Sequence, residues 1–350
     1  MIVGVGLDSR LRLSFGDLRE AARAAEALGF ESAWTPAGGV PDAFHVCTAW
    51  SLDTSLRTGI SVVPVARMWT ARSLAAQAAT VALCSEGRFV VGLGTGGYGP
   101  GFWSSVGLPN RPIAVMRDYV DTVGRLLAGE TVTHHGPAVT LERVNLGVKD
   151  LPACPVYLGA LGPQMVTLAG EVADGVLLNW ATPERIAESR RLVANGAAKA
   201  GRDPGEVTVT MYIRVCVDDD VEAARRAFGE QVLSYAMGRP GTPNQAGYRG
   251  LFAQMGYDEV LSDLEARRER GATMDELVAA TPDEMLHAVG YYGPASGAAA
   301  RYAQLSEGLD ETVVRVITAR PGLDPVVATM EALTPALIRQ AERGATPSSA

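Results

Sequence analysis

Short apolar runs alternate with amphipathic segments along almost the whole of this 350-residue chain. Apolar runs of this length are typical of strands that are buried on both faces of a sheet. The segments between them repeat apolar residues at the three- and four-residue spacing of a helix with one buried face. We expect strands at residues 2–8, 31–37, 56–66, 87–94, 154–160, 174–180, 206–218 and 311–320.

This alternation predicts an α/β fold with a parallel sheet, because each strand needs a crossover helix before the next parallel strand can begin. Eight such units favour a closed (β/α)₈ TIM barrel over an open, doubly wound sheet. We expect one barrel domain over residues 1–345. The stretch 219–310 is longer than one crossover requires and carries several helical patterns. It is therefore interpreted as a helical insertion between strands seven and eight.

Charge and cysteine usage exclude several classes of partner. With 39 acidic and 31 basic residues, the net charge of −8 disfavours binding to nucleic acid or to an anionic membrane. The N-terminus resembles a strand and not a secretion signal, and no apolar run reaches the roughly 18 residues of a membrane span. The four cysteines are scattered and the histidines lack metal-ligand spacing. We expect a cytoplasmic protein without a metal site.

A glycine string near the fourth strand spells G-x-G-x-x-G from Gly92 to Gly97. In a dinucleotide-binding fold this string opens a helix, and an acidic residue follows about 20 positions later. Here three prolines and further glycines delay any helix until after Pro112, and Asp118 lies inside a helical pattern. The string therefore fails its structural context. We interpret it as a turn at the carboxyl end of a barrel strand, where barrel enzymes keep their chemistry.

A second string of small residues, Gly159 to Pro163, follows the fifth strand and precedes a helical pattern. Backbone N–H groups in such a turn can bind an anion, and proline fits the first helical turn. The string indicates a phosphate cradle. A plain tight turn between strand and helix explains the same residues.

Four stretches together resemble the luciferase-like family of flavin and deazaflavin oxidoreductases: 59–81, 87–97, 155–178 and 311–322. They follow the order and spacing of that family, and they are most similar to its branch that uses coenzyme F-420. The resemblance implies hydride transfer between coenzyme F-420 and an organic substrate. An FMN-dependent monooxygenase and a non-catalytic barrel that binds a flavin or deazaflavin remain the alternatives.

The resemblance also implies which residues hold the cofactor. Ser61 and Val62 correspond to a bulge with a non-prolyl cis peptide that backs the ring, and Gly94 to Gly96 correspond to the turn beside the ring or its ribityl chain. The second glycine string corresponds to the phosphate loop. The implied cofactor residues are Ser61, Val62, Gly94, Thr95, Gly96, Gly159, Ala160, Leu161, Gly162 and Pro163.

The chain departs from the sugar-phosphate dehydrogenases of this family. Its second strand ends in Trp34 to Ala37 without an Asp-His pair, and Gly97 and Tyr98 stand where an acidic residue is expected. The catalytic residues therefore remain unknown. Aromatic residues near strand ends predict a pocket for a small apolar substrate, and the sequence leaves a homodimer open. The predicted pocket residues are Trp34, Phe44, Trp69, Tyr98, Trp103 and Trp180.

Overall fold

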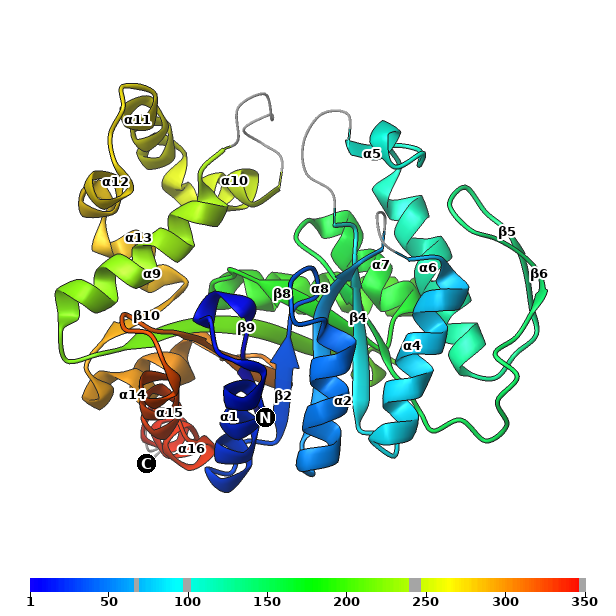
Figure 1. Cartoon of the computed structure of the whole chain (residues 1–350). Coiled ribbons are helices and arrows are strands. Elements are labelled where there is room, and N and C mark those ends of the chain that lie inside the picture. Colours follow the sequence, from blue (N-terminus) through cyan, green and yellow to red (C-terminus); the bar gives the residue numbers. More distant parts are fainter. Residues whose placement is uncertain (66–68, 97–101, 239–246, 346–350) are drawn as a thin grey trace, which may run out of the picture.

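Eight parallel strands close into a barrel in the computed structural model, which describes residues 1–65, 69–96, 102–238 and 247–345 (Figure 1). Each predicted strand is present, and pairing of the first strand with the last, from Ile2↔Glu311 to Gly6↔Arg315, closes the circle. The (β/α)₈ prediction is confirmed. The barrel strands are β1 (Ile2–Gly6), β2 (Ser32–Thr35), β3 (Arg57–Pro64), β4 (Phe89–Gly94), β7 (Val156–Gly159), β8 (Gly175–Asn179), β9 (Thr208–Val217) and β11 (Glu311–Ile317).

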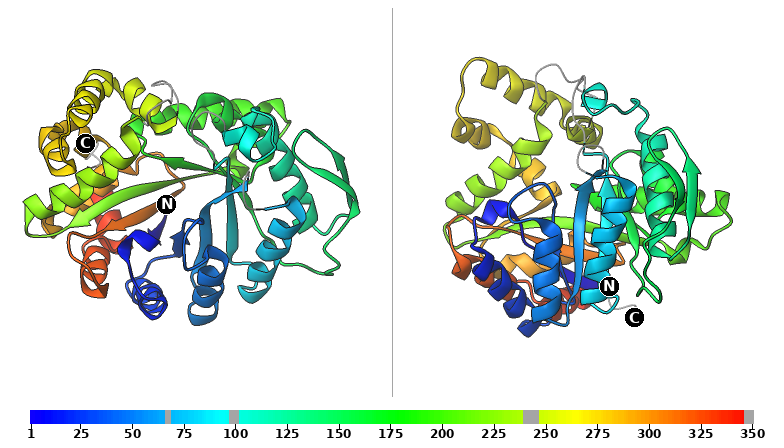
Figure 2. Two further views of the ribbon diagram at one scale, coloured as in Figure 1. Left: turned by 45° about the horizontal axis from the view of Figure 1, so that its top comes forward. Right: turned by 45° about the vertical axis from the view of Figure 1, so that its right-hand side comes forward.

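Helices surround the strands on the outside of the barrel (Figure 2). The outer helices are α1 (Phe15–Ala27), α2 (Ala43–Asp53), α4 (Ala71–Cys84), α6 (Pro112–Leu127), α7 (Pro163–Val172), α8 (Pro183–Lys199), α14 (Ala295–Leu305), α15 (Leu323–Glu331) and α16 (Pro335–Ala345). A side chain caps the N-terminus of α1, of α2 and of α4. The Ser14 side chain accepts from the Asp17 backbone N–H, and Thr70 accepts in the same way from Ser73. Asp42 caps α2, and Pro41 precedes that helix after a cis peptide bond.

The insertion after β9 contains α9 (Val221–Ala236), α10 (Gly247–Phe252), a π-helical turn (Ala253–Tyr257), α11 (Asp258–Glu269), α12 (Met274–Ala280) and α13 (Asp283–Ala288). An apolar cluster around Phe228 and Phe252 packs it against barrel residues such as Cys216 of β9. Figure 1 shows it above the strands, on the side of their carboxyl ends. The predicted region also contains a short strand, β10 (Gly290–Gly293), which extends the β9 edge, and the barrel helix α14. The insertion is therefore shorter than its predicted bounds.

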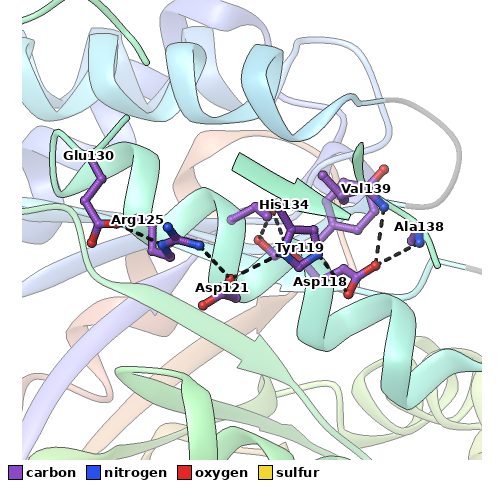
Figure 3. A network of polar contacts seen from close by, with 9 residues as sticks. Asp118, Tyr119, Asp121, Arg125, Glu130, His134, Ala138 and Val139 are labelled. Atoms are coloured by element: carbon purple, nitrogen blue, oxygen red, sulfur yellow. Dashed lines mark hydrogen bonds and ion pairs between the residues drawn. The ribbon is translucent and has the colours of Figure 1, made fainter. Parts of the chain in front are cut away.

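A two-stranded hairpin that the sequence pattern did not predict lies outside α6: β5 (Val132–His135) and β6 (Thr140–Val144). Asp118 of α6 anchors it (Figure 3). The buried Asp118 carboxylate accepts from the Ala138 and Val139 backbone N–H groups at 2.8 and 3.3 Å, and His134 Nε2 lies 3.3 Å away. Asp118 thus holds a surface hairpin, which agrees with the rejection of a dinucleotide site.

Apolar strands place the core both inside the barrel and between the strands and helices. Every residue of β4 and of β11 is buried. Trp34 lies inside the barrel because Gly59 on the neighbouring strand leaves room for its ring. Among the described residues, no helix has the length and apolarity that crossing a membrane requires.

Candidate active site

A cleft of about 420 Å³ opens at the carboxyl ends of the barrel strands. Residues from all eight barrel strands, or from the loops that follow them, line it. Tyr235 of α9 and Tyr248 of α10 add one wall from the insertion. The position agrees with the general rule that barrel enzymes place their sites at this end.

One wall, here called the glycine wall, consists of Ser61, Val62 and Pro64 with Gly94 to Gly96 and Gly159 to Leu161. The Ser61–Val62 peptide bond is cis, as the family resemblance implied, and the β3–β4 register shifts between Ile60 and Val63. Eight of the ten predicted cofactor residues lie here and line the cleft: Ser61, Val62, Gly94, Thr95, Gly96, Gly159, Ala160 and Leu161.

Two glycines of this wall make room for the Val62 side chain. A Cβ atom on Gly94 would lie 2.5 Å from Val62 Cγ2, and one on Gly159 would lie 2.9 Å from Val62 Cγ1. Gly96 has a positive φ of 69°, and a Cβ there would lie 2.2 Å from the Pro64 Cβ. Glycine is therefore required by packing against the bulge itself.

Gly162 and Pro163 lie just beyond the residues that line the cleft. Gly162 is the N-cap of α7 and Pro163 is its first residue, as the sequence predicted. Within the described residues, no side chain caps this helix, and no atom lies within 4 Å of the place of a Cβ on Gly162. Phosphate binding at this turn stays a prediction.

The facing wall, here called the arginine wall, is centred on Arg214 of β9 and Arg315 of β11. The two residues are paired in register on adjacent strands, and both are buried, with 3% and 5% of their surface exposed. Arg315 Nη2 contacts the Asp8 carboxylate, and Arg214 Nη1 donates to Asn179 Oδ1 at 2.6 Å. Burial lowers the pKa of both guanidinium groups, because each cation has lost its hydration.

Aromatic side chains support the arginine wall from behind. The Arg214 guanidinium lies 3.8 Å from the centre of the Trp180 ring, and Trp180 has a left-handed φ of 55° directly after β8. The Arg315 guanidinium lies 5.0 Å from the Tyr212 ring. The Tyr212 hydroxyl is buried next to Ser61, and it completes no hydrogen bond within the described part of the chain. Burial raises the Tyr212 pKa, so this hydroxyl keeps its proton at neutral pH.

Of the predicted substrate-pocket residues that the structure describes, Trp34, Phe44 and Trp180 are buried, and Trp69 and Trp103 are partly buried. Trp34, Phe44, Trp69, Trp103 and Trp180 are all absent from the lining of the cleft. Large rings instead fill the core: Phe44 of α2 packs edge-on against Trp69, with 5.4 Å between the ring centres. Tyr98 and Gly97 lie outside the described residues. The prediction of an apolar substrate depended on aromatic residues in the cleft, and the described residues do not supply them.

Sequence reasoning missed the arginine wall, although a signal was present. Arg214 interrupts the apolar run MYIRVCV, and Arg315 interrupts VVRVI. A charged residue inside a strand that is buried on both faces must have a partner or a function. In the described part of the chain, no group of His, Cys, Asp and Glu side chains could hold a metal ion.

The chain is similar in sequence and in structure to known proteins. Residues 4–312 match the family model described as luciferase-like monooxygenase. The 5,10-methylenetetrahydromethanopterin reductase of Methanolobus tindarius is 30% identical over 308 residues, 86% of this chain and 89% of the relative. The structure of the coenzyme F-420 dependent tetrahydromethanopterin reductase from Methanopyrus kandleri has a TM-score of 0.77 at 21% identity, covering 96% of this chain and 99% of that one. An F-420-dependent secondary alcohol dehydrogenase has a TM-score of 0.74 at 18% identity, with 96% and 98% covered. The two solved structures share the fold.

Proposed function

The chain belongs to the luciferase-like monooxygenase family, and from this premise we propose that it is an oxidoreductase that transfers a hydride between coenzyme F-420 and a small organic substrate. The relative from Methanolobus tindarius, which aligns over most of both chains, is a reductase by name. The observation in the structure that carries the proposal is the glycine wall, with Val62 between Gly94 and Gly159 on one side of the cleft.

The residues of this wall fit a flat ring. Val62 and the glycines present backbone and small apolar groups, and the wall contains no ionisable side chain among the described residues. The uncapped start of α7 follows the same wall after Leu161, so a phosphate at the end of the cofactor would lie near its N–H groups. Ser61, Val62, Gly94 and Gly159 would then hold the ring, and the turn at Gly162 would hold the phosphate.

The bound coenzyme supplies hydride chemistry, and the protein orients the reactants and excludes water. Val62 would cover one face of a bound ring, and substrate would then approach from the side of the arginine wall. Tyr212 lines the same cleft and keeps its proton at Oη. That hydroxyl can donate a hydrogen bond to an oxygen or nitrogen atom of a substrate.

Titration of the purified chain with F-420, and separately with FMN, tests the proposal. We expect F-420 to bind with a dissociation constant of about 1 μM or below, equivalent to about −8 kcal/mol or tighter. FMN should bind more weakly. If FMN copurifies in stoichiometric amount and F-420 does not displace it, the proposal fails and the FMN-dependent monooxygenase takes its place.

A further inference from the structure

We propose that Arg214 and Arg315 bind an oxyanionic group of the substrate, either a carboxylate or a phosphate monoester. This inference rests on the function proposed above. Arginine is suited to such a group because its planar guanidinium donates two parallel hydrogen bonds to paired oxygen atoms. The evidence comes from the charge balance of the cleft, from the unused hydrogen-bond donor of Arg315, and from the place of the two arginines in the barrel.

The cleft has an excess of positive charge. Among the described residues that line it, Arg10, Arg214 and Arg315 are cationic and only Asp8 is anionic. This excess is local, because the whole chain has a net charge of −8. A neighbouring cavity of about 400 Å³ shares these four residues and adds two exposed ones of opposite charge, Arg12 and Glu230. Burying two cations that share one carboxylate costs free energy unless a further anion compensates the charge.

Hydrogen bonding leaves a donor available for this anion. Asp8 contacts Nη2 of Arg315, whereas Nη1 is buried and has no hydrogen-bond partner among the described residues. Asn179 and the Trp180 ring hold Arg214, so its guanidinium is positioned before any ligand arrives. Because the two arginines are adjacent in register, one oxyanion can contact both and reduce the repulsion between them.

The arginines lie away from the predicted cofactor residues. In the closed barrel, β9 stands four strands from β3 in either direction, so Arg214 faces the Ser61–Val62 bulge across the cleft. The predicted phosphate turn follows β7, two strands from β9. A substrate that lies between the ring site and the arginine wall would therefore present its anionic end to the arginines. The cofactor phosphate is the competing source of the same chemistry, and the experiment separates the two.

Three small probes test this inference on the full chain, without F-420 and saturated with it: benzoate, inorganic phosphate and benzamide. Benzamide matches benzoate in shape but has no charge. The variants are Arg214→Gln, and the double variant Asp8→Asn/Arg315→Gln, which removes the ion pair as a unit so that no buried charge is left alone. Arg320→Gln is the matched control, because Arg320 follows the same strand as Arg315, pairs with Asp218 and is absent from the cleft.

We expect benzoate or phosphate to bind wild type at least about tenfold more tightly than benzamide, measured by calorimetry. Arg214→Gln and the double variant should each weaken that binding by about tenfold or more, and Arg320→Gln should change it by less than about twofold. The affinity for F-420 should stay within about twofold of wild type in all three variants. Thermal unfolding checks that each variant is folded.

Equal binding of all three probes, or no binding of either anion, would overturn the inference. An equal loss in Arg320→Gln would do the same, because it would show a general effect of charge. A tenfold loss of F-420 affinity in Arg214→Gln would assign the arginines to the cofactor phosphate and also refute it. The chain could also bind benzoate in a way that depends on Arg214 but not bind F-420. That result would support the oxyanion site and refute only the proposed cofactor.

Discussion

The place of Val62 between two glycines gives a direct test of how the cleft is shaped. In Gly94→Ala, the new Cβ would lie 2.5 Å from Val62 Cγ2 and 3.3 Å from Val62 Cβ. Carbon atoms in good contact are about 3.5–4.0 Å apart, so the Val62 side chain must move by roughly 1 Å. Forcing an extra methyl group into packed structure typically costs about 1–3 kcal/mol.

The direction of that movement decides its effect. Gly159 lies on another side of Val62, where a Cβ would be only 2.9 Å from Val62 Cγ1, so little space is available there. Val62 is only partly buried, and its open side is the cleft. The side chain must therefore shift toward the ring site. We expect Gly94→Ala to weaken F-420 binding about tenfold, which corresponds to about 1.4 kcal/mol, and to lower stability modestly.

Fluorescence titration with F-420 and urea unfolding measure the two effects. Gly124→Ala is the matched control, because no atom of the described part of the chain lies within 4 Å of a Cβ at that position of α6. It should bind F-420 as wild type does, and it should be more stable by up to about 1 kcal/mol because alanine favours the helix. The double variant Gly94→Ala/Val62→Ala removes the methyl groups that clash. The double variant should lose about 1 kcal/mol less F-420 binding free energy than the sum of the losses in Gly94→Ala and Val62→Ala.

Two results would refute this reasoning. If Gly94→Ala binds F-420 like wild type, the ring does not lie against Val62. If the double variant shows no coupling, the loss in the single variant has a cause other than the contact between the two side chains.

Three further outcomes follow from other parts of the molecule. Gly162→Glu should keep its fold, since the position is open, and weaken F-420 binding by at least about tenfold through repulsion of the phosphate; unchanged affinity in a titration would place the phosphate elsewhere. Glu311→Ala should lower the unfolding free energy by about 3 kcal/mol in urea, because it leaves Arg57 without its buried partner; an unchanged midpoint would contradict this. Hydrogen bonds, first from Lys199, lower the Glu171 pKa, so Glu171→Gln should be less stable than wild type at neutral pH. This difference should shrink as the pH falls below the ordinary glutamate pKa of about 4.3 and the carboxylate takes up a proton; a difference constant with pH would exclude this origin.

The barrel could be predicted because its signals are local. Eight apolar runs and the helices between them depend on residues close in sequence. Parallel strands that are joined by short crossovers can be connected in few ways. The hairpin at Val132–Val144 escaped prediction because most of its residues are exposed and polar, so it lacks apolar alternation. It stays in place through Asp118, a contact from another element that no local pattern contains.

Some parts of the candidate site could likewise be predicted from local sequence, and others could not. The glycine wall follows from two strings of small residues, and the family resemblance led to the Ser61–Val62 bulge. The aromatic residues do not line the cleft, because an aromatic residue near a strand end can face either the cleft or the core, and composition does not distinguish the two. Trp34 turns inward because Gly59, on another strand, leaves a space that fits its ring.

By itself, the sequence determined the strand order, the crossover helices and the positions of the glycine-rich strand ends, because apolar periodicity and backbone freedom act within a few residues. Only the tertiary structure decided that Arg214 and Arg315, 101 positions apart, lie side by side with Asp8 at the mouth of one cleft. The closure of the barrel sets this arrangement, since it pairs β11 with both β9 and β1. Charge in a buried site depends on neighbours that the chain supplies from distant strands, and those neighbours exist only when the barrel has closed.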